Sequence, residues 1–133
     1  EYKLHPRPGV ASPGDRAKFL HVQQYITATA YPFVASLFLH TLKPADEQDP
    51  KYIETATGKW KTLLAPTLEC FCDGPFFMGD KMSAIDFLVA KPLNNAAAMG
   101  VLEEFPKLNK LFQKVKCLPS FAKAYGVDVN TCS

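Results

Sequence analysis

Asp86 is a carboxylate within an apolar stretch of the chain, between Ile85 and Phe87. A carboxylate in such surroundings is a candidate general acid or base. Ser83 offers another explanation, because Ser-x-x-Asp matches a capping box: the hydroxyl accepts from the N–H of Asp86, and the carboxylate accepts from the N–H of Ser83. Met82 and Phe87 stand at the positions of a hydrophobic staple around it. We therefore predict that Ser83 and Asp86 form a structural capping box, and we assign no catalytic residue to the chain.

Four cysteines are the remaining candidates for metal or redox chemistry: Cys70, Cys72, Cys117 and Cys132. Cys70 and Cys72 project from different sides of a helix and have no second pair, so the spacing of a zinc site is missing. His5, His21 and His40 have no carboxylate or cysteine at ligand spacing. We expect four reduced thiols, no metal site, no cofactor held by this chain and no catalytic histidine.

Charge is weakly informative, because the chain carries a formal net charge of only +2. This mild basic bias predicts neither a nucleic-acid partner nor a membrane surface. Lys107, Lys110 and Lys114 follow the i, i+3, i+7 spacing of one helix face. Such a run suits an acidic partner, but a solvated face is the commoner outcome, and we name no binding surface there.

The first helix is expected to start at Ser12-Pro13-Gly14-Asp15, which offers an N-cap hydroxyl, a proline at the first helical position and an early carboxylate. Apolar residues at intervals of three and four continue the pattern to about Leu42. Pro32 removes the hydrogen bond to the carbonyl of Ala28, so we expect a bend there. Asp49-Pro50 repeats the start signal for a second long helix, which ends near Asp73 and packs antiparallel to the first.

Residues 76–80 are apolar but too short for a helix, and we expect them to cross the bundle as an extended segment. A third helix opens at Ser83 and is apolar on all sides up to Lys91, which predicts a central buried helix. Phe105-Pro106 starts a fourth helix, and Pro119-Ser120 leads to a last turn near Tyr125. No alternating strand pattern appears, so the fold class is all-α. No apolar run approaches bilayer length, which favours a cytoplasmic protein without a membrane partner.

Three stretches in order carry a family resemblance. The first is Gly-Asp-Arg-Ala at residues 14–17, followed by Tyr25 and Pro32. The second, at residues 77–86, has a Gly-Asp turn and an apolar residue before Ser-x-x-Asp. The third, at residues 105–121, has an aromatic-Pro-x-Leu start and a later Pro-x-Phe. Together they resemble the C-terminal domain of the cytosolic glutathione S-transferase superfamily, over nearly all of residues 12–125. The resemblance implies a glutathione transferase C-terminal-like helical bundle at 12–126, a linker at 1–11 from a missing N-terminal domain, and a tail at 127–133.

In that family a thioredoxin-like N-terminal domain supplies the Tyr, Ser or Cys that activates the thiol of glutathione. This sequence has no counterpart of that domain. The resemblance therefore implies a parent protein that is a detoxifying transferase with glutathione as its co-substrate. It also implies that the chain is inactive without the missing half.

The resemblance further assigns a site for a small hydrophobic electrophile and a homodimer contact on this helical domain. By position, the middle of the first helix gives Gln24, Thr27 and Tyr31, and the end of the central helix gives Asn95 and Met99. Simple packing or solvation is an equal alternative for these five residues.

Two alternatives to the transferase domain remain open. The first is a non-catalytic protein-interaction module, because the same helical domain serves in that way in translation-factor and synthetase assemblies. The second is a free-standing ligand carrier. The sequence upstream of Glu1 separates the enzyme from the interaction module, because a thioredoxin fold with a thiol-activating residue there favours the enzyme.

Overall fold

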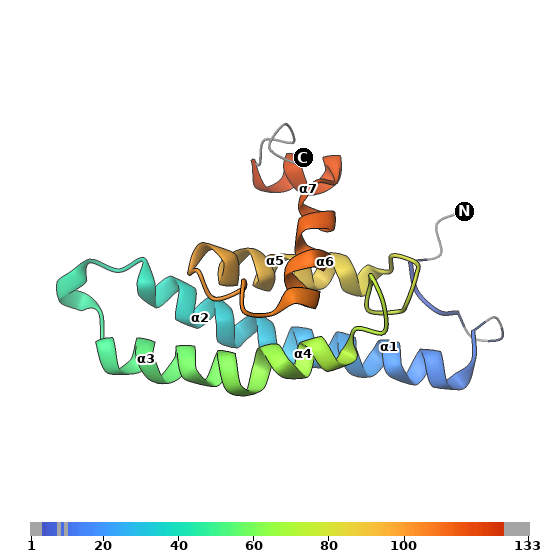
Figure 1. The fold of residues 1–133 in the computed structure, drawn as a ribbon, viewed down its shortest axis with the longest axis horizontal. Helices are drawn as coiled ribbons and strands as arrows, with labels where there is room; N and C mark the ends of the chain where they lie inside the picture. Colours follow the sequence, from blue (N-terminus) through green and yellow to red (C-terminus); the bar gives the residue numbers. More distant parts are fainter. Residues whose placement is uncertain (1–3, 8, 10, 127–133) are drawn as a thin grey trace.

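Two long helical rods form an antiparallel hairpin along the longest axis of the molecule (Figure 1). The structure, a computed structural model, describes residues 4–7, 9 and 11–126. The first rod consists of α1 (Pro13–Tyr25), a π-helical turn (Ile26–Ala30) and α2 (Tyr31–Thr41). The second consists of α3 (Pro50–Lys59), another π-helical turn (Trp60–Leu64) and α4 (Ala65–Phe71). The two long helices expected from the sequence are therefore present, each interrupted by a wider turn.

Side chains cap both rods where the sequence predicts a start. Ser12 Oγ accepts from the N–H of Asp15 at 3.0 Å, and Asp49 Oδ1 accepts from the N–H groups of Lys51 and Tyr52 at 3.0 and 3.1 Å. These bonds satisfy N–H groups that have no partner within the first turn of a helix. At the loop between the rods, His40 Nε2 accepts from the N–H of Asp49 at 2.8 Å. His40 thus has a structural role in the loop.

The bend expected at Pro32 takes the form of a π turn just before that proline. The N–H of Tyr31 donates to the carbonyl of Ile26, five residues earlier, so the turn is wider than an α-helical one. Pro66 stands in the same position after the second π turn, where the N–H of Ala65 donates to the carbonyl of Trp60. A proline interrupts the α-helical hydrogen bonds by lacking an N–H and by clashing with the preceding turn. Both rods accommodate that interruption in the same way.

The second π turn also changes which leucine faces inward. Leu63 and Leu64 both fit the spacing of apolar residues expected for the inward face of the second long helix, but Leu64 is buried and Leu63 is 62% exposed. Within each π turn a threonine hydroxyl bonds back to a carbonyl: Thr27 to Gln23 at 2.9 Å and Thr62 to Gly58 at 2.8 Å. These bonds give carbonyls near the irregular turn an additional donor.

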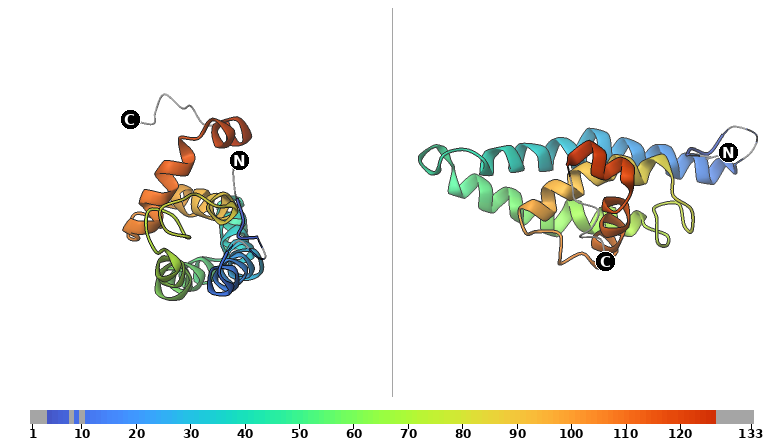
Figure 2. Two further views of the ribbon diagram at one scale, coloured as in Figure 1. Left: turned by 90° about the vertical axis from the view of Figure 1, so that its right-hand side faces the viewer. Right: turned by 90° about the horizontal axis from the view of Figure 1, so that it is seen from above.

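The core lies where the hairpin meets α5 (Ala84–Ala98), which packs along α1 and α2 and against α6 (Pro106–Lys116) (Figure 2). Trp60 is fully buried in this core, and its indole Nε1 donates to the carbonyl of Val101 at 3.2 Å. This bond fixes the connection between α5 and α6 to the second rod. Glu69 caps α6 from α4, because its Oε1 accepts from the N–H of Lys107 at 2.8 Å. The last helix, α7 (Pro119–Tyr125), packs on α6 and ends at Gly126, which has a left-handed φ of 65°.

Residues 76–80 are not the extended segment that the sequence suggested. Phe76 and Gly79 exchange two backbone hydrogen bonds, at 3.1 and 3.2 Å, which close a tight turn. Gly79 adopts a φ of +93°, which a residue with a Cβ rarely tolerates. The turn directs Phe77 into the core, where it is fully buried. This isolated pairing is the nearest approach to a strand within the described part of the chain.

The expectation of four reduced cysteines is wrong for Cys117, which is disulfide-bonded. Cys70 and Cys72 are free thiols, and Cys132 lies outside the described residues. Sequence spacing excluded a zinc site but carried no information on whether distant thiols meet.

Candidate functional site

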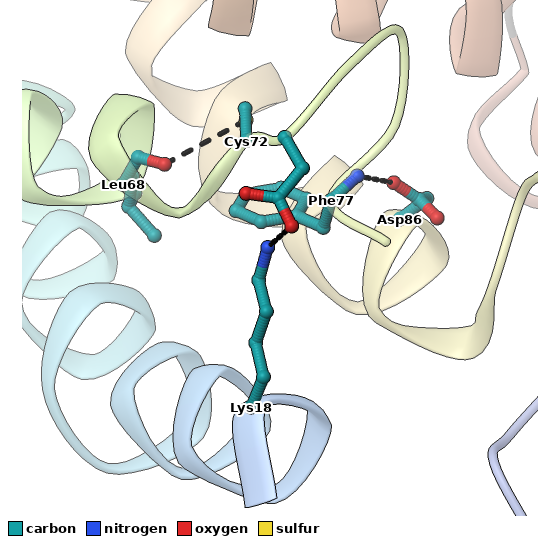
Figure 3. Close-up of polar contacts among 6 residues, drawn as sticks. Lys18, Leu68, Cys72, Phe77 and Asp86 are labelled. Atoms are coloured by element: carbon teal, nitrogen blue, oxygen red, sulfur yellow. Dashed lines mark hydrogen bonds and ion pairs between the residues drawn. The ribbon is translucent and has the colours of Figure 1, made fainter. Parts of the chain in front are cut away.

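Asp86 is fully buried at the start of α5 and joins it to the preceding turn (Figure 3). Its Oδ2 accepts from the backbone N–H of Ser83 at 2.7 Å and from the hydroxyl of Ser83 at 3.0 Å. Its Oδ1 accepts from the N–H of Phe77 at 3.0 Å. Ser83 and Asp86 thus form the capping box at this helix start. It differs from the predicted pair in one bond, because the hydroxyl of Ser83 donates to the carboxylate and the N–H of Asp86 donates to the carbonyl of Ser83 at 3.2 Å. Both oxygens accept from structural donors, and the side chain is fully buried and lines none of the grooves described below, so the geometry is that of an anchor.

A surface groove lies at the π turn of the first rod. The widened turn exposes Thr27 and Tyr31, and α5 brings Phe87, Leu88 and Lys91 to the same place. Tyr125, the last residue of α7, closes the groove, whose volume is about 340 Å³. Three elements far apart in the sequence therefore meet here.

The groove is lined mainly by apolar and aromatic surface. Tyr31, Phe87, Leu88 and Tyr125 are each between 39% and 43% exposed. Large apolar side chains left half in water and gathered around one hollow are typical of a ligand or partner site. We define the groove by these four residues together with Thr27 and Lys91, and call it the aromatic groove.

Lys91 gives the aromatic groove a single positive charge. Its Nζ lies 5.2 Å from the centroid of the Tyr125 ring, within the range of a cation–π contact. No carboxylate lines the groove. Thr27 is not available as a nucleophile, since its hydroxyl donates to the carbonyl of Gln23. The arrangement is suited to holding an apolar ligand and offers no activated nucleophile and base pair.

The structure brings together two of the five residues suggested for substrate binding, Thr27 and Tyr31. Gln24 is exposed but does not line the groove. Asn95 is 2% exposed, and its Oδ1 accepts no hydrogen bond from the described residues. Met99 is partly buried against the core. The assignment of Gln24, Asn95 and Met99 to a substrate site stays a prediction.

Four of the groove residues were not identified from the sequence: Phe87, Leu88, Lys91 and Tyr125. The sequence treats α5 as buried on every side, whereas Phe87 and Leu88 are each about two-fifths exposed. One feature of the sequence does indicate that Phe87 faces outward: Lys91 follows it by four residues and so lies on the same side of α5.

Cys72, a buried free thiol, is chemically inert. Burial, with a smaller contribution from the charge of Asp86, raises the pKa of Cys72 to about 12. Its Sγ donates to the carbonyl of Leu68 at 3.6 Å. A thiol that stays protonated at neutral pH is a poor nucleophile and a poor metal ligand. Among the described residues, no group of three His, Cys, Asp or Glu side chains is placed to hold a metal ion.

The sequence profile of the family described as "Glutathione S-transferase, C-terminal domain" matches residues 28–125, which is most of the chain. The chain therefore belongs to this family, and the all-α bundle is its fold. No curated protein and no solved structure matches the chain significantly. In the part of the chain that the structure describes, no helix combines the length and the hydropathy needed to cross a bilayer.

Proposed function

We propose that this domain supplies the apolar wall of the substrate site in a glutathione transferase, with the aromatic groove holding a small hydrophobic electrophile. The observation that carries the proposal is the gathering of four half-exposed large side chains around one hollow, Tyr31 among them. Family membership supports the reaction class. The single cation of Lys91 suits an electrophile that carries an electron-withdrawing or anionic substituent.

The same proposal places the sulfur chemistry outside this domain. The aromatic groove contains no carboxylate and no thiol, and its hydroxyls have no general base beside them. A thioredoxin-like domain that binds glutathione and activates its thiol is the partner that the reaction requires. By itself the chain then binds the electrophile without conjugating it, and the whole enzyme works in the cytoplasm as a detoxifying transferase.

A homodimer contact on the hairpin is the third part of the proposal. Four leucines on the two rods and at the start of the loop between them are more than half exposed: Leu20, Leu39, Leu42 and Leu63. None of them lines the aromatic groove. A partner that packs along the hairpin would take these side chains out of water.

The test is to titrate the isotope-labelled chain with an aryl halide such as chlorodinitrobenzene and to follow backbone amides by two-dimensional NMR. Amides of Thr27, Tyr31, Leu88 and Lys91 should shift together. Replacing Tyr31 by Ala should weaken binding by about threefold to tenfold, because one aromatic contact of about 1 kcal/mol is lost.

Leu39→Ala is the matched control, since Leu39 is an exposed large apolar residue of the same helix outside the groove. It should leave the affinity unchanged. Shifts that cluster elsewhere, or an equal loss in both variants, would remove the aromatic groove from the substrate site.

A further inference from the structure

A second groove, on another face, is dominated by lysines. It lies between the loop around Pro75 and the outer side of α6, has a volume of about 440 Å³, and is lined by Lys107, Lys110 and Lys114. The amides of Asn109 and Gln113 complete the α6 side. No aspartate or glutamate lines it. We call it the lysine groove.

The charge of the lysine groove is not neutralised by its surroundings. The three lysines are exposed and form no ion pair with any residue in the described ranges. Three carboxylates near the groove are engaged elsewhere: Glu69 accepts from the N–H groups at the start of α6, Asp73 pairs with Lys18, and Glu104 pairs with Lys61. Glu103, which is exposed in the connection before α6, does not line the groove. Three positive charges thus exceed the whole net charge of the chain, +2, at one place. Such concentration raises the local potential and attracts anions.

Contacts within the groove also hold part of it in position. Lys114 Nζ lies 5.2 Å from the centroid of the Phe76 ring, and Gln113 Nε2 donates to Asn109 Oδ1 at 3.4 Å. Lys114 is therefore supported over a turn that the buried Phe77 anchors to the core. A partly fixed lysine loses less side-chain entropy on binding than a free one.

The spacing of the lysines fits an extended peptide. Lys107 and Lys114 are seven residues apart, which is about 10 Å along a helix, and an extended chain covers that distance in about three residues. Side-chain amides both donate and accept, so Asn109 and Gln113 can pair with the backbone N–H and C=O groups of a peptide. A phosphodiester backbone offers acceptors alone. Pro75 adds apolar lining, which also favours a peptide.

We propose that the lysine groove binds an extended acidic peptide segment of a partner protein, with carboxylates facing Lys107, Lys110 and Lys114. This site is separate from the aromatic groove, since the two share no residue. The proposal is independent of the transferase reaction and would hold for a catalytic or a non-catalytic parent.

The experiment is a fluorescence-anisotropy titration of the chain with a short peptide of alternating aspartate and glutamate that carries an uncharged dye. The variant combines Lys107→Gln, Lys110→Gln and Lys114→Gln. The control combines Lys43→Gln, Lys51→Gln and Lys59→Gln, which removes the same charge from exposed lysines of the hairpin. We expect the groove variant to lose about tenfold or more in affinity and the control less than about threefold, because three local ion pairs are removed from the groove variant alone.

Several results would overturn the proposal. An equal loss in the two triple variants would show general charge attraction, and equal binding of an asparagine–glutamine version of the peptide would show that charge is not recognised. A single-stranded oligonucleotide that binds more tightly than the peptide would assign the groove to nucleic acid. If the groove variant instead abolishes self-association without peptide, the occupant is a second copy, whose acidic loop at 46–49 would fill the groove. Circular dichroism of both variants checks that neither is unfolded.

Discussion

The carboxylate of Asp86 joins the start of α5 to the turn at Phe77, which is nine residues earlier in the chain. The bond from the N–H of Ser83 to Oδ2 belongs to the capping box, which the Ser-x-x-Asp pattern predicts. The other link, from Oδ1 to the N–H of Phe77, ties the buried Phe77 to the same helix start (Figure 3). Removing the carboxylate therefore leaves two backbone N–H groups without an acceptor in a site that excludes water.

Asp86→Ala should lower the free energy of unfolding by about 3 kcal/mol or more, because each orphaned buried N–H costs about 1–3 kcal/mol. Asp86→Asn keeps one oxygen and should recover about half. Chemical denaturation followed by the fluorescence of Trp60, which is fully buried, measures all the variants.

The sequence pattern, taken as a reciprocal pair, predicts that Ser83→Ala matches Asp86→Ala. The structure changes that expectation, because Ser83→Ala removes one hydroxyl donor and leaves both N–H groups satisfied. We expect it to cost about 1 kcal/mol. Asp80→Ala, at an exposed carboxylate of the same turn, should change stability by no more than about 0.5 kcal/mol. A loss at Asp86 as small as that at Asp80 would mean that the carboxylate anchors nothing.

At the scale of the element, each π turn keeps the buried residues of its rod on one face of the helix. Each rod buries four residues at successive intervals of four: Val22, Ile26, Ala30 and Val34 in the first, and Ala56, Trp60, Leu64 and Leu68 in the second. In a continuous α-helix twelve residues turn through about 1200°, so the first and last would point about 120° apart. A π turn takes up one extra residue and removes about 100° of that drift. All four side chains of each rod can then face the core.

Deleting one exposed residue of a π turn should therefore restore an ordinary α-helix without misaligning the core. Thr29 is exposed within the first π turn, and Pro32→Ala returns the missing N–H. We expect the protein lacking Thr29 and carrying Pro32→Ala to fold cooperatively, with a loss of at most about 2 kcal/mol. Thermal unfolding followed by circular dichroism measures it.

The matched control is deletion of Leu20, an exposed residue inside α1, in the same Pro32→Ala background. It rotates the start of α1 by about 100° relative to the rest of the rod, and should abolish cooperative folding. Equal stability of the two deletion variants would show that burial does not set the helical register.

At the scale of the molecule, the exposed leucines are the feature that the isolated fold leaves uncovered. The buried core accounts for the inward face of every long helix, yet Leu39, Leu42 and Leu63 are each more than three-fifths exposed. An isologous pair of hairpins would cover such residues twice across one two-fold axis.

Sedimentation should therefore show a concentration-dependent dimer. The combination of Leu39→Lys with Leu63→Lys should shift it to monomer, because a charge buried in an interface is strongly unfavourable. Leu88→Lys serves as the control, since Leu88 lines the aromatic groove instead of the hairpin surface, and it should leave the dimer intact. A strict monomer at high concentration would contradict the proposal that the hairpin forms the dimer contact.

The sequence by itself determined the class of fold and the positions of the helix starts. Ser12, Asp49 and Ser83 mark the starts of their helices through local chemistry, since the hydrogen bonds of a helix cap join residues no more than three positions apart. The family resemblance rested on the same local features, and the match over residues 28–125 agrees with it. Such short-range signals are available before any tertiary contact forms.

Pro32 and Pro66 marked where the rods are interrupted, but only the tertiary structure decided that the interruptions are π turns, and it alone decided the tight turn at 76–79 and the aromatic groove. The register of each rod depends on which residues the opposing helices bury, and the groove needs Tyr31, Leu88 and Tyr125 from three separate elements. Periodicity describes one helix at a time, so it could assign Thr27 and Tyr31 to a face but not identify what faces them. Phe77 shows the same limit, because its hydrogen bond to Asp86 exists only when the turn has closed over the helix start.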